Sequence, residues 1–128
     1  MKFSTKAEYG LRAMTSLAFD FPEKKSIGDI AKLENISIKY LERLMNELRK
    51  SELIKSYKGK KGGYVLSRNP KKIKVGEIVE ALEGLISPMD CESKKCKSKQ
   101  CFSRVVWVEL GRQIRKTLYS IKLSDLIK

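Results

Sequence analysis

Two short helical patterns joined by a tight turn constrain the fold of this chain more than any other feature. Ser26 and Ser37 each precede an amphipathic segment, and a serine hydroxyl there can accept a free backbone N–H of the first helical turn. Asp29 stands at the capping-box position in place of glutamate. The two segments cover residues 26–34 and 37–51, and their apolar residues recur at helical spacing: Ile27, Ile30, Ala31 and Leu33, then Leu41, Leu44, Met45 and Leu48. This pattern predicts a helix-turn-helix.

A β-hairpin is predicted directly after these helices. Residues 53–57 and 64–67 have strand-forming composition, and the glycines among residues 58–63 permit the positive φ angles of a tight turn. A hairpin in this position is a wing, and its tip would carry Lys58, Lys60 and Lys61. The expected fold class is therefore mainly α with a small β-hairpin wing, a winged helix-turn-helix.

Further helices are predicted on both sides of this unit. The first covers residues 5–19 and can be capped by Ser4 or Thr5, and another covers residues 75–84. A long helix over residues 103–119 has an apolar surface broader than one small domain can cover, and Gly111 would let a second helix approach closely. We interpret it as a dimerisation helix; the alternative is packing on its own domain alone. Residues 124–127 form a short capped turn.

The charge of the chain favours a polyanionic partner. The sequence has 28 Lys and Arg against 15 Asp and Glu, a formal net charge of +13. Residues 37–74 alone hold 12 basic and three acidic side chains, the clustering expected for phosphate binding. A solvated face, an acidic membrane surface and general RNA binding are the alternatives. No apolar run is long enough for a transmembrane helix, and charges interrupt the N-terminal apolar positions, so we expect no membrane association and a cytoplasmic protein.

The cysteines indicate a metal site. Cys91, Cys96 and Cys101 are an odd number of thiols with C-x4-C-x4-C spacing, and disulfides are rare in the cytosol. The paired C-x2-C knuckles of zinc ribbons are absent, whereas thiolates are the ligands of iron–sulphur clusters. Four lysines between the cysteines should favour thiolate over thiol: Lys94, Lys95, Lys97 and Lys99. We predict a 2Fe–2S or 4Fe–4S cluster; redox-active thiols without metal, zinc, or no role are the alternatives.

The fourth ligand of such a cluster stays open. The chain contains no histidine, so a three-cysteine, one-histidine site is excluded. The remaining candidates are the carboxylates of Glu8, Asp90 and Glu92, or a ligand from a second subunit. Each of these carboxylates is otherwise an ordinary surface charge.

The residues expected to contact DNA lie on the second helix of the helix-turn-helix and on the wing. Side chains near the start of a recognition helix meet base edges in the major groove; here they are Ser37, Lys39, Tyr40, Glu42 and Arg43. Arg43 could donate two hydrogen bonds to guanine, and Glu42 could accept one from cytosine. Ser4, Thr5 and Lys6 are expected on the same surface. No catalytic constellation or P-loop is visible, so we do not expect an enzyme.

The chain also resembles the bacterial regulator family that includes IscR, NsrR and CymR. The resemblance spans essentially the whole chain and is carried by three stretches: residues 1–14, 36–44 and 58–66. It implies a homodimer that binds a near-palindromic double-stranded operator. It also implies that Cys91, Cys96 and Cys101 match the cluster ligands of IscR and NsrR, and that Lys58 stands where IscR has a wing arginine.

The departures from that family pattern are informative. The cysteine intervals are four residues rather than the commoner five, and Arg104 replaces the histidine ligand of IscR. Glu8 matches the position at which NsrR-like proteins use a carboxylate from the partner subunit. CymR-like members lack the cysteine triad, so we expect a poor match to them.

These predictions combine into one hypothesis. Residues 1–85 form the DNA-binding domain, residues 86–102 the cluster-binding loop, and residues 103–128 the dimerisation helix and C-terminal turn. The protein would be a repressor-type transcription regulator that senses cluster status, redox state or nitric oxide. A metal-free regulator of the same fold, controlled by thiol oxidation or a partner protein, is the alternative.

Overall fold

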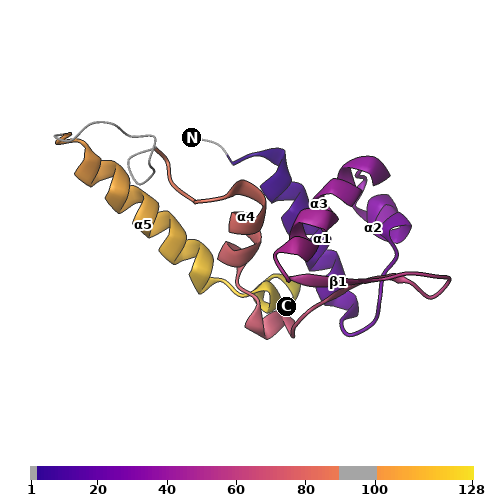
Figure 1. Ribbon diagram of the computed structural model, residues 1–128. Helices are drawn as coiled ribbons and strands as arrows, with labels where there is room; N and C mark the ends of the chain where they lie inside the picture. Colours follow the sequence, from indigo (N-terminus) through magenta and orange to yellow (C-terminus); the bar gives the residue numbers. More distant parts are fainter. Residues whose placement is uncertain (1–2, 90–100) are drawn as a thin grey trace.

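A computed structural model describes residues 3–89 and 101–128. Three helices form the N-terminal unit: α1 (Thr5–Asp20), α2 (Ile27–Glu34) and α3 (Ile38–Lys50). The strands β1 (Ile54–Tyr57) and β2 (Gly63–Leu66) follow as an antiparallel pair. The short helix η1 (Pro70–Lys72), α4 (Val75–Glu83), α5 (Arg104–Ser120) and η3 (Leu123–Ile127) complete the described chain. Figure 1 shows the wing and α5 extending from opposite sides of the helical body.

The predicted capping residues place α2 and α3. The Ser26 hydroxyl accepts the Asp29 N–H at 3.1 Å, and the Ser37 hydroxyl accepts the Tyr40 N–H at 3.2 Å. Between the helices, Asn35 takes the left-handed conformation that ends α2, with φ 54°. The helix-turn-helix and the wing are therefore confirmed.

One core is shared by α1, α3, α4, the wing and the C-terminal segment. The predicted apolar stripe of α3 lies within it and is at most 1% exposed: Leu41, Leu44, Met45 and Leu48. The chain after α5 returns to this core, because the Leu123 N–H donates to the Ile73 carbonyl at 2.8 Å and Leu123 is fully buried. Among the described residues, no helix is long and apolar enough to cross a membrane.

Two local predictions are wrong. Leu33 is 64% exposed, because successive helical residues turn by about 100° and Leu33 therefore faces about 200° away from the buried Ala31. Ser4 occupies the N-cap position of α1, but its hydroxyl makes no capping bond to that helix. It donates instead to the carboxylate of Glu83 at the end of α4.

Candidate DNA-binding surface and cysteine site

The recognition helix α3 presents a free polar face. Lys39, Glu42 and Arg43 are exposed, and none of them forms a hydrogen bond or ion pair with another described residue. Ser37 is also exposed, although its hydroxyl is used by the helix cap. The buried apolar stripe on the other side of α3 fixes which face is outward. The outer face of α3 is therefore exposed and carries Lys39 and Arg43 beside Glu42.

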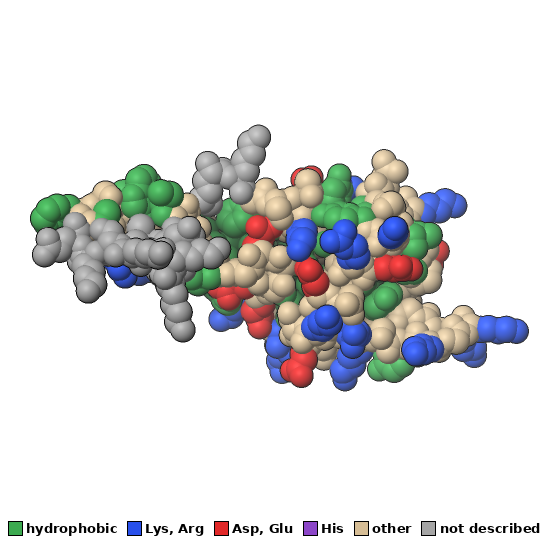
Figure 2. Space-filling model, turned by 45° about the horizontal axis from the view of Figure 1, so that its top comes forward, with side chains coloured by type: hydrophobic (Ala, Val, Ile, Leu, Met, Phe, Trp, Pro, Cys, Tyr) green, Lys and Arg blue, Asp and Glu red, His purple; other side chains and the backbone are tan. Residues whose placement is uncertain are grey.

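The wing carries exposed lysines at its tip. Strand pairing runs from Ile54 opposite Leu66 to Tyr57 opposite Gly63. The turn closes through a Gly62 N–H bond to the Gly59 carbonyl at 2.9 Å, and Gly59 has φ +98°. Lys58, Lys60 and Lys61 are all exposed. Figure 2 shows Lys and Arg side chains at the narrow end that protrudes on the right. These cations extend the basic surface beyond α3.

Lys25 joins the wing to α1, a link that sequence reasoning missed. Its backbone pairs with Tyr64 of β2 through N–H···O bonds of 2.9 and 2.8 Å. Its ammonium donates to the hydroxyl and carbonyl of Ser16, at 3.1 and 3.2 Å, and lies 2.5 Å from the carboxylate of Asp20. The Lys25 side chain is only 12% exposed. The sequence around Lys25 gave no signal that this side chain would be largely buried.

The first turn of α1 is bound to the rest of the protein. The Ser4 N–H donates to Glu83 Oε1 at 3.2 Å, and the Thr5 and Tyr40 hydroxyls lie 3.2 Å apart. Lys6 Nζ lies 3.3 Å from Glu47 Oε1 of α3. These predicted DNA contacts therefore have partners inside the chain.

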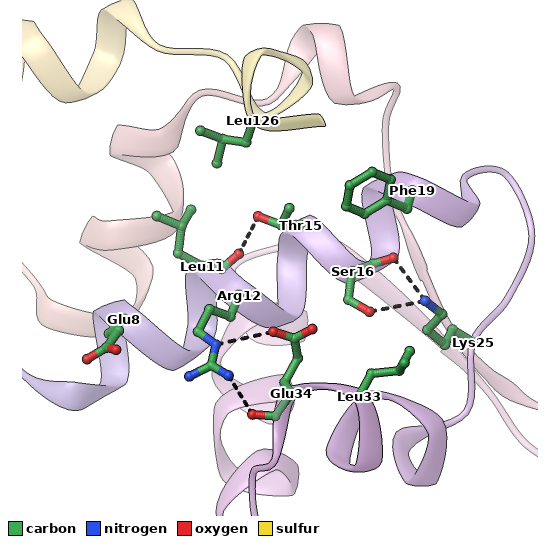
Figure 3. A pocket seen from close by; sticks show the side chains of 10 residues that line it. All are labelled: Glu8, Leu11, Arg12, Thr15, Ser16, Phe19, Lys25, Leu33, Glu34 and Leu126. Carbon is green, nitrogen blue, oxygen red and sulfur yellow. Dashed lines mark hydrogen bonds and ion pairs between the residues drawn. The ribbon is translucent and has the colours of Figure 1, made fainter. Parts of the chain in front are cut away.

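Aromatic and charged side chains connect α1 with the other two helices of this unit. The rings of Tyr9 and Tyr40 meet edge-to-face with centroids 5.9 Å apart. The Arg12 guanidinium lies over the Tyr9 ring, 5.2 Å from its centroid. Arg12 also donates to the side chain and carbonyl of Glu34 at 3.2 and 2.6 Å, as Figure 3 shows. This network fixes the turn between α2 and α3 against α1.

Two grooves meet at Glu8. The larger, of about 660 Å³, runs along α1 between α2 and η3 (Figure 3) and includes the exposed side chains of Phe19, Leu33 and Leu126. The smaller, of about 330 Å³, lies between α1, α4 and the end of α5. Glu8 lines both grooves and is itself exposed. Its carboxylate is therefore accessible from outside this chain.

Of the three cysteines predicted to bind a cluster, Cys101 is the one that lies among the described residues, and it is partly exposed. The Ser103 hydroxyl, 3.1 Å from its sulphur, lowers the pKa of the Cys101 thiol. Cys91 and Cys96, together with Asp90 and Glu92, lie outside the described residues. The described residues contain no group of three potential metal ligands, and Figure 1 shows the start of α5 well away from α1. Among the described residues, no contact joins Glu8 of α1 to Cys101, which precedes α5.

Helix α5 is attached to the body at its C-terminal end and exposes apolar side chains at its N-terminal end. At its C-terminal end the Tyr119 hydroxyl donates to Glu80 at 2.7 Å, and burial together with this bond raises the pKa of Tyr119 to about 12. At the other end large apolar side chains are exposed: Phe102 (95%), Val105 (74%), Val106 (58%) and Leu110 (42%). Figure 2 shows them as a hydrophobic patch at the free end of the molecule.

The capped helix pair, the basic outer face and the lysine-tipped wing define a winged helix-turn-helix transcription regulator. The family model Rrf2, described as an iron-dependent transcriptional regulator, matches residues 3–128. The chain belongs to the Rrf2 family. Its relatives are transcription regulators rather than enzymes, and the chain is likewise a transcription regulator and not an enzyme.

Individual relatives match over nearly the whole chain. Protein rrf2 of Nitratidesulfovibrio vulgaris is 37% identical over 132 residues, which span 100% of this chain and 88% of that protein. The structure of CymR, the global cysteine regulator of Bacillus subtilis, matches with TM-score 0.83 and 37% identity over 98% of this chain and 95% of that one. The structure of IscR from T. potens matches with TM-score 0.83 and 38% identity, and the match covers 99% of this chain and 86% of that one.

The expected poor match to CymR-like members is therefore wrong for the chain as a whole. The helices, the wing and the core occupy most of the chain and are common to both relatives. The cysteine triad occupies only a short segment, so it contributes little to a whole-chain similarity.

Proposed function

We propose that this chain is a homodimeric DNA-binding repressor whose affinity for its operator is controlled by an iron–sulphur cluster held by Cys91, Cys96 and Cys101. The observation that carries the proposal is the spacing of the three cysteines among lysines next to α5. The lowered pKa of the Cys101 thiol supports it, because the thiolate is the form that binds iron. With no histidine in the chain, a carboxylate suits the fourth position.

The dimer supplies the remaining parts of this proposal. Exposed apolar side chains on α5 would be buried against a second copy, which is the favourable outcome for such a patch. Glu8 of the partner subunit could then complete the cluster site, since Glu8 is exposed and the start of α5 lies well away from α1 of the same chain (Figure 1). When bound, the cluster would hold the three cysteine thiolates together and so restrain the segment between α4 and α5.

DNA recognition in this proposal divides between α3 and the wing. Lys39, Glu42 and Arg43 would meet base edges, while Lys58, Lys60 and Lys61 would contact the phosphate backbone. In a dimer the two recognition helices would read half-sites separated by about one helical turn, ~34 Å. A change at the cysteine segment would alter that separation and thereby the affinity for DNA.

The test is anaerobic purification followed by DNA binding. Wild-type protein is expected to be brown, to contain iron and acid-labile sulphide, and to change its operator affinity when iron is removed. Replacing all three cysteines by alanine should abolish the colour and the iron response, whereas a matched variant with Ser93 and Ser98 changed to alanine should keep both. Colourless wild-type protein after reconstitution with iron and sulphide under argon would contradict the proposal.

A second candidate is a metal-free regulator controlled by thiol oxidation or by a partner protein. The equal similarity to CymR, a cysteine regulator, favours it, and the lowered pKa of Cys101 would also make that thiol reactive. It predicts DNA binding that responds to oxidants but not to iron. Wild-type protein that has never held iron separates the two candidates, because its operator affinity should respond to oxidants only if the thiols act without metal. The triple-cysteine variant should then lose that oxidant response.

A further inference from the structure

We propose that the first turn of α1 is a positioning element for the recognition helix, and that the Thr5 and Tyr40 side chains act on each other rather than on DNA. This inference rests on the proposed function only in requiring sequence-specific DNA binding. Both residues were predicted from sequence to contact DNA. The contacts they make in the structure give them a different role.

Side-chain and backbone contacts link the start of α1 to the end of α4. Ser4 is the N-cap of α1, yet both its hydroxyl and its N–H donate to the carboxylate of Glu83, the last residue of α4. A carboxylate at a helix N-terminus interacts favourably with the helix dipole, and such charge-assisted hydrogen bonds are stronger than neutral ones. The two helices also pack without space between them, because a Cβ at Gly10 would collide with the Leu82 side chain. The end of α4 and the start of α1 therefore move together.

Side-chain contacts also link the start of α1 to the first turn of α3. The Tyr40 hydroxyl lies 3.2 Å from the Thr5 hydroxyl, and its ring lies edge-on against Tyr9, one helical turn further along α1. The Tyr40 backbone N–H is held by Ser37, so this residue lies in the first turn of α3. Both ends of the Tyr40 side chain are thus engaged by α1. A base contact would require it to leave these partners.

A further ion pair links α1 to α3 about two turns along α3 from Tyr40. Lys6 Nζ lies 3.3 Å from Glu47 Oε1, while the second oxygen of Glu47 is buried and has no hydrogen-bond partner within the described part of the chain. Lys6 is the only cation that the described structure places on this carboxylate, so moving Lys6 to a phosphate would leave Glu47 without its charged partner. The first turn of α1 therefore holds α3 through two successive residues.

Together the α1–α4 and α1–α3 contacts form a short path between the cysteine segment and the recognition helix. Glu83 is the last helical residue before that segment, and it contacts Ser4. The neighbouring residue, Thr5, contacts the first turn of α3. A displacement of the end of α4 would be passed through two adjacent residues to the start of the recognition helix.

The experiment is a double-mutant cycle on Thr5→Val and Tyr40→Phe. The probe is a DNA duplex selected from a randomised pool by the wild-type protein. Each single change removes one side of a single hydrogen bond, so we expect each to weaken binding about three- to tenfold. The affinity of the double variant for the duplex should equal that of the single variant with the lower affinity, because both changes remove the same interaction.

Three further readouts separate positioning from DNA contact or from a loss of folding. The dependence of affinity on salt and the preferred sequence should match wild type in Tyr40→Phe, and urea unfolding should leave every variant fully folded under binding conditions. Glu83→Gln, which keeps an acceptor for Ser4, should bind better than Glu83→Leu. Additive losses, no loss in the single variants, or an altered base preference in Tyr40→Phe would overturn the inference. A wild-type protein that selects no sequence would instead overturn the proposed function.

Discussion

At the residue scale, Arg43 and Lys60 offer two chemically different contacts to DNA. Arg43 is exposed on the outer face of α3, and its guanidinium can donate two parallel hydrogen bonds to the O6 and N7 atoms of guanine. Lys60 is exposed in the turn of the wing, and its ammonium is a point charge suited to a phosphate. The two side chains should therefore contribute to binding in ways that separate measurements can distinguish.

Substituting each with alanine tests this difference. Arg43→Ala should cost about 1–3 kcal/mol on the selected sequence and relax the preference at one base pair. Lys60→Ala should weaken binding to all sequences similarly and reduce the slope of log affinity against log salt by about 1. Titrations of selected and scrambled duplexes at several salt concentrations measure both effects. Equal losses on both duplexes for Arg43→Ala would place it among the phosphate contacts and contradict base reading.

At the scale of elements, the wing depends on a side chain outside its own strands. Lys25→Met keeps much of the side-chain volume but removes the ammonium shared by Asp20 and Ser16. Because these bonds involve a charged and largely buried donor, we expect a loss of about 1–3 kcal/mol in the free energy of unfolding. Amide hydrogen exchange at Tyr64, which pairs with the Lys25 backbone, should become faster.

Lys24→Met is the matched control for this change. Lys24 is exposed, and its ammonium lies over the Tyr57 ring, 4.1 Å from the centroid. An exposed cation–π contact of this kind is worth about 0.5–1 kcal/mol, so the control should cost less and leave Tyr64 exchange unchanged. Urea unfolding of both variants provides the comparison. Equal losses would mean that the Lys25 ion pair does not stabilise the wing.

The helix-turn-helix and the wing were predictable because their signals are local. Ser26 and Ser37 cap within three residues, the Leu41–Leu48 stripe repeats every turn, and glycines mark the hairpin turn. The roles of Lys25, Ser4 and Tyr40 were not predictable, because the partners that define these roles lie on other elements, 5 to 79 residues away in the sequence. Periodicity identifies which face of a helix is buried, but it does not show which polar residue on another element will meet it.

At the scale of the whole molecule, the proposed pairing of two recognition helices rests on α5. Figure 1 shows one end of α5 extending away from the body, and Figure 2 shows hydrophobic side chains gathered at this end. Burial of a valine-sized side chain contributes about 1.5–3 kcal/mol, so several of them would supply a substantial part of the free energy of the proposed dimer. In a dimer, binding of one half-site makes binding of the second intramolecular, which raises the overall affinity.

Val106→Glu should therefore separate dimerisation from DNA recognition. A carboxylate buried without a partner is strongly unfavourable, so sedimentation should shift from twice the chain mass to the chain mass. Affinity for a duplex with two half-sites should fall at least tenfold, whereas affinity for a single half-site should stay at the wild-type value because α3 and the wing are unchanged. Lys116→Glu, at an exposed polar position of the same helix, should remain dimeric and keep the higher affinity for two half-sites. If Val106→Glu stays dimeric, or if it loses half-site binding as well, then the apolar face of α5 is not the surface that pairs the two recognition helices.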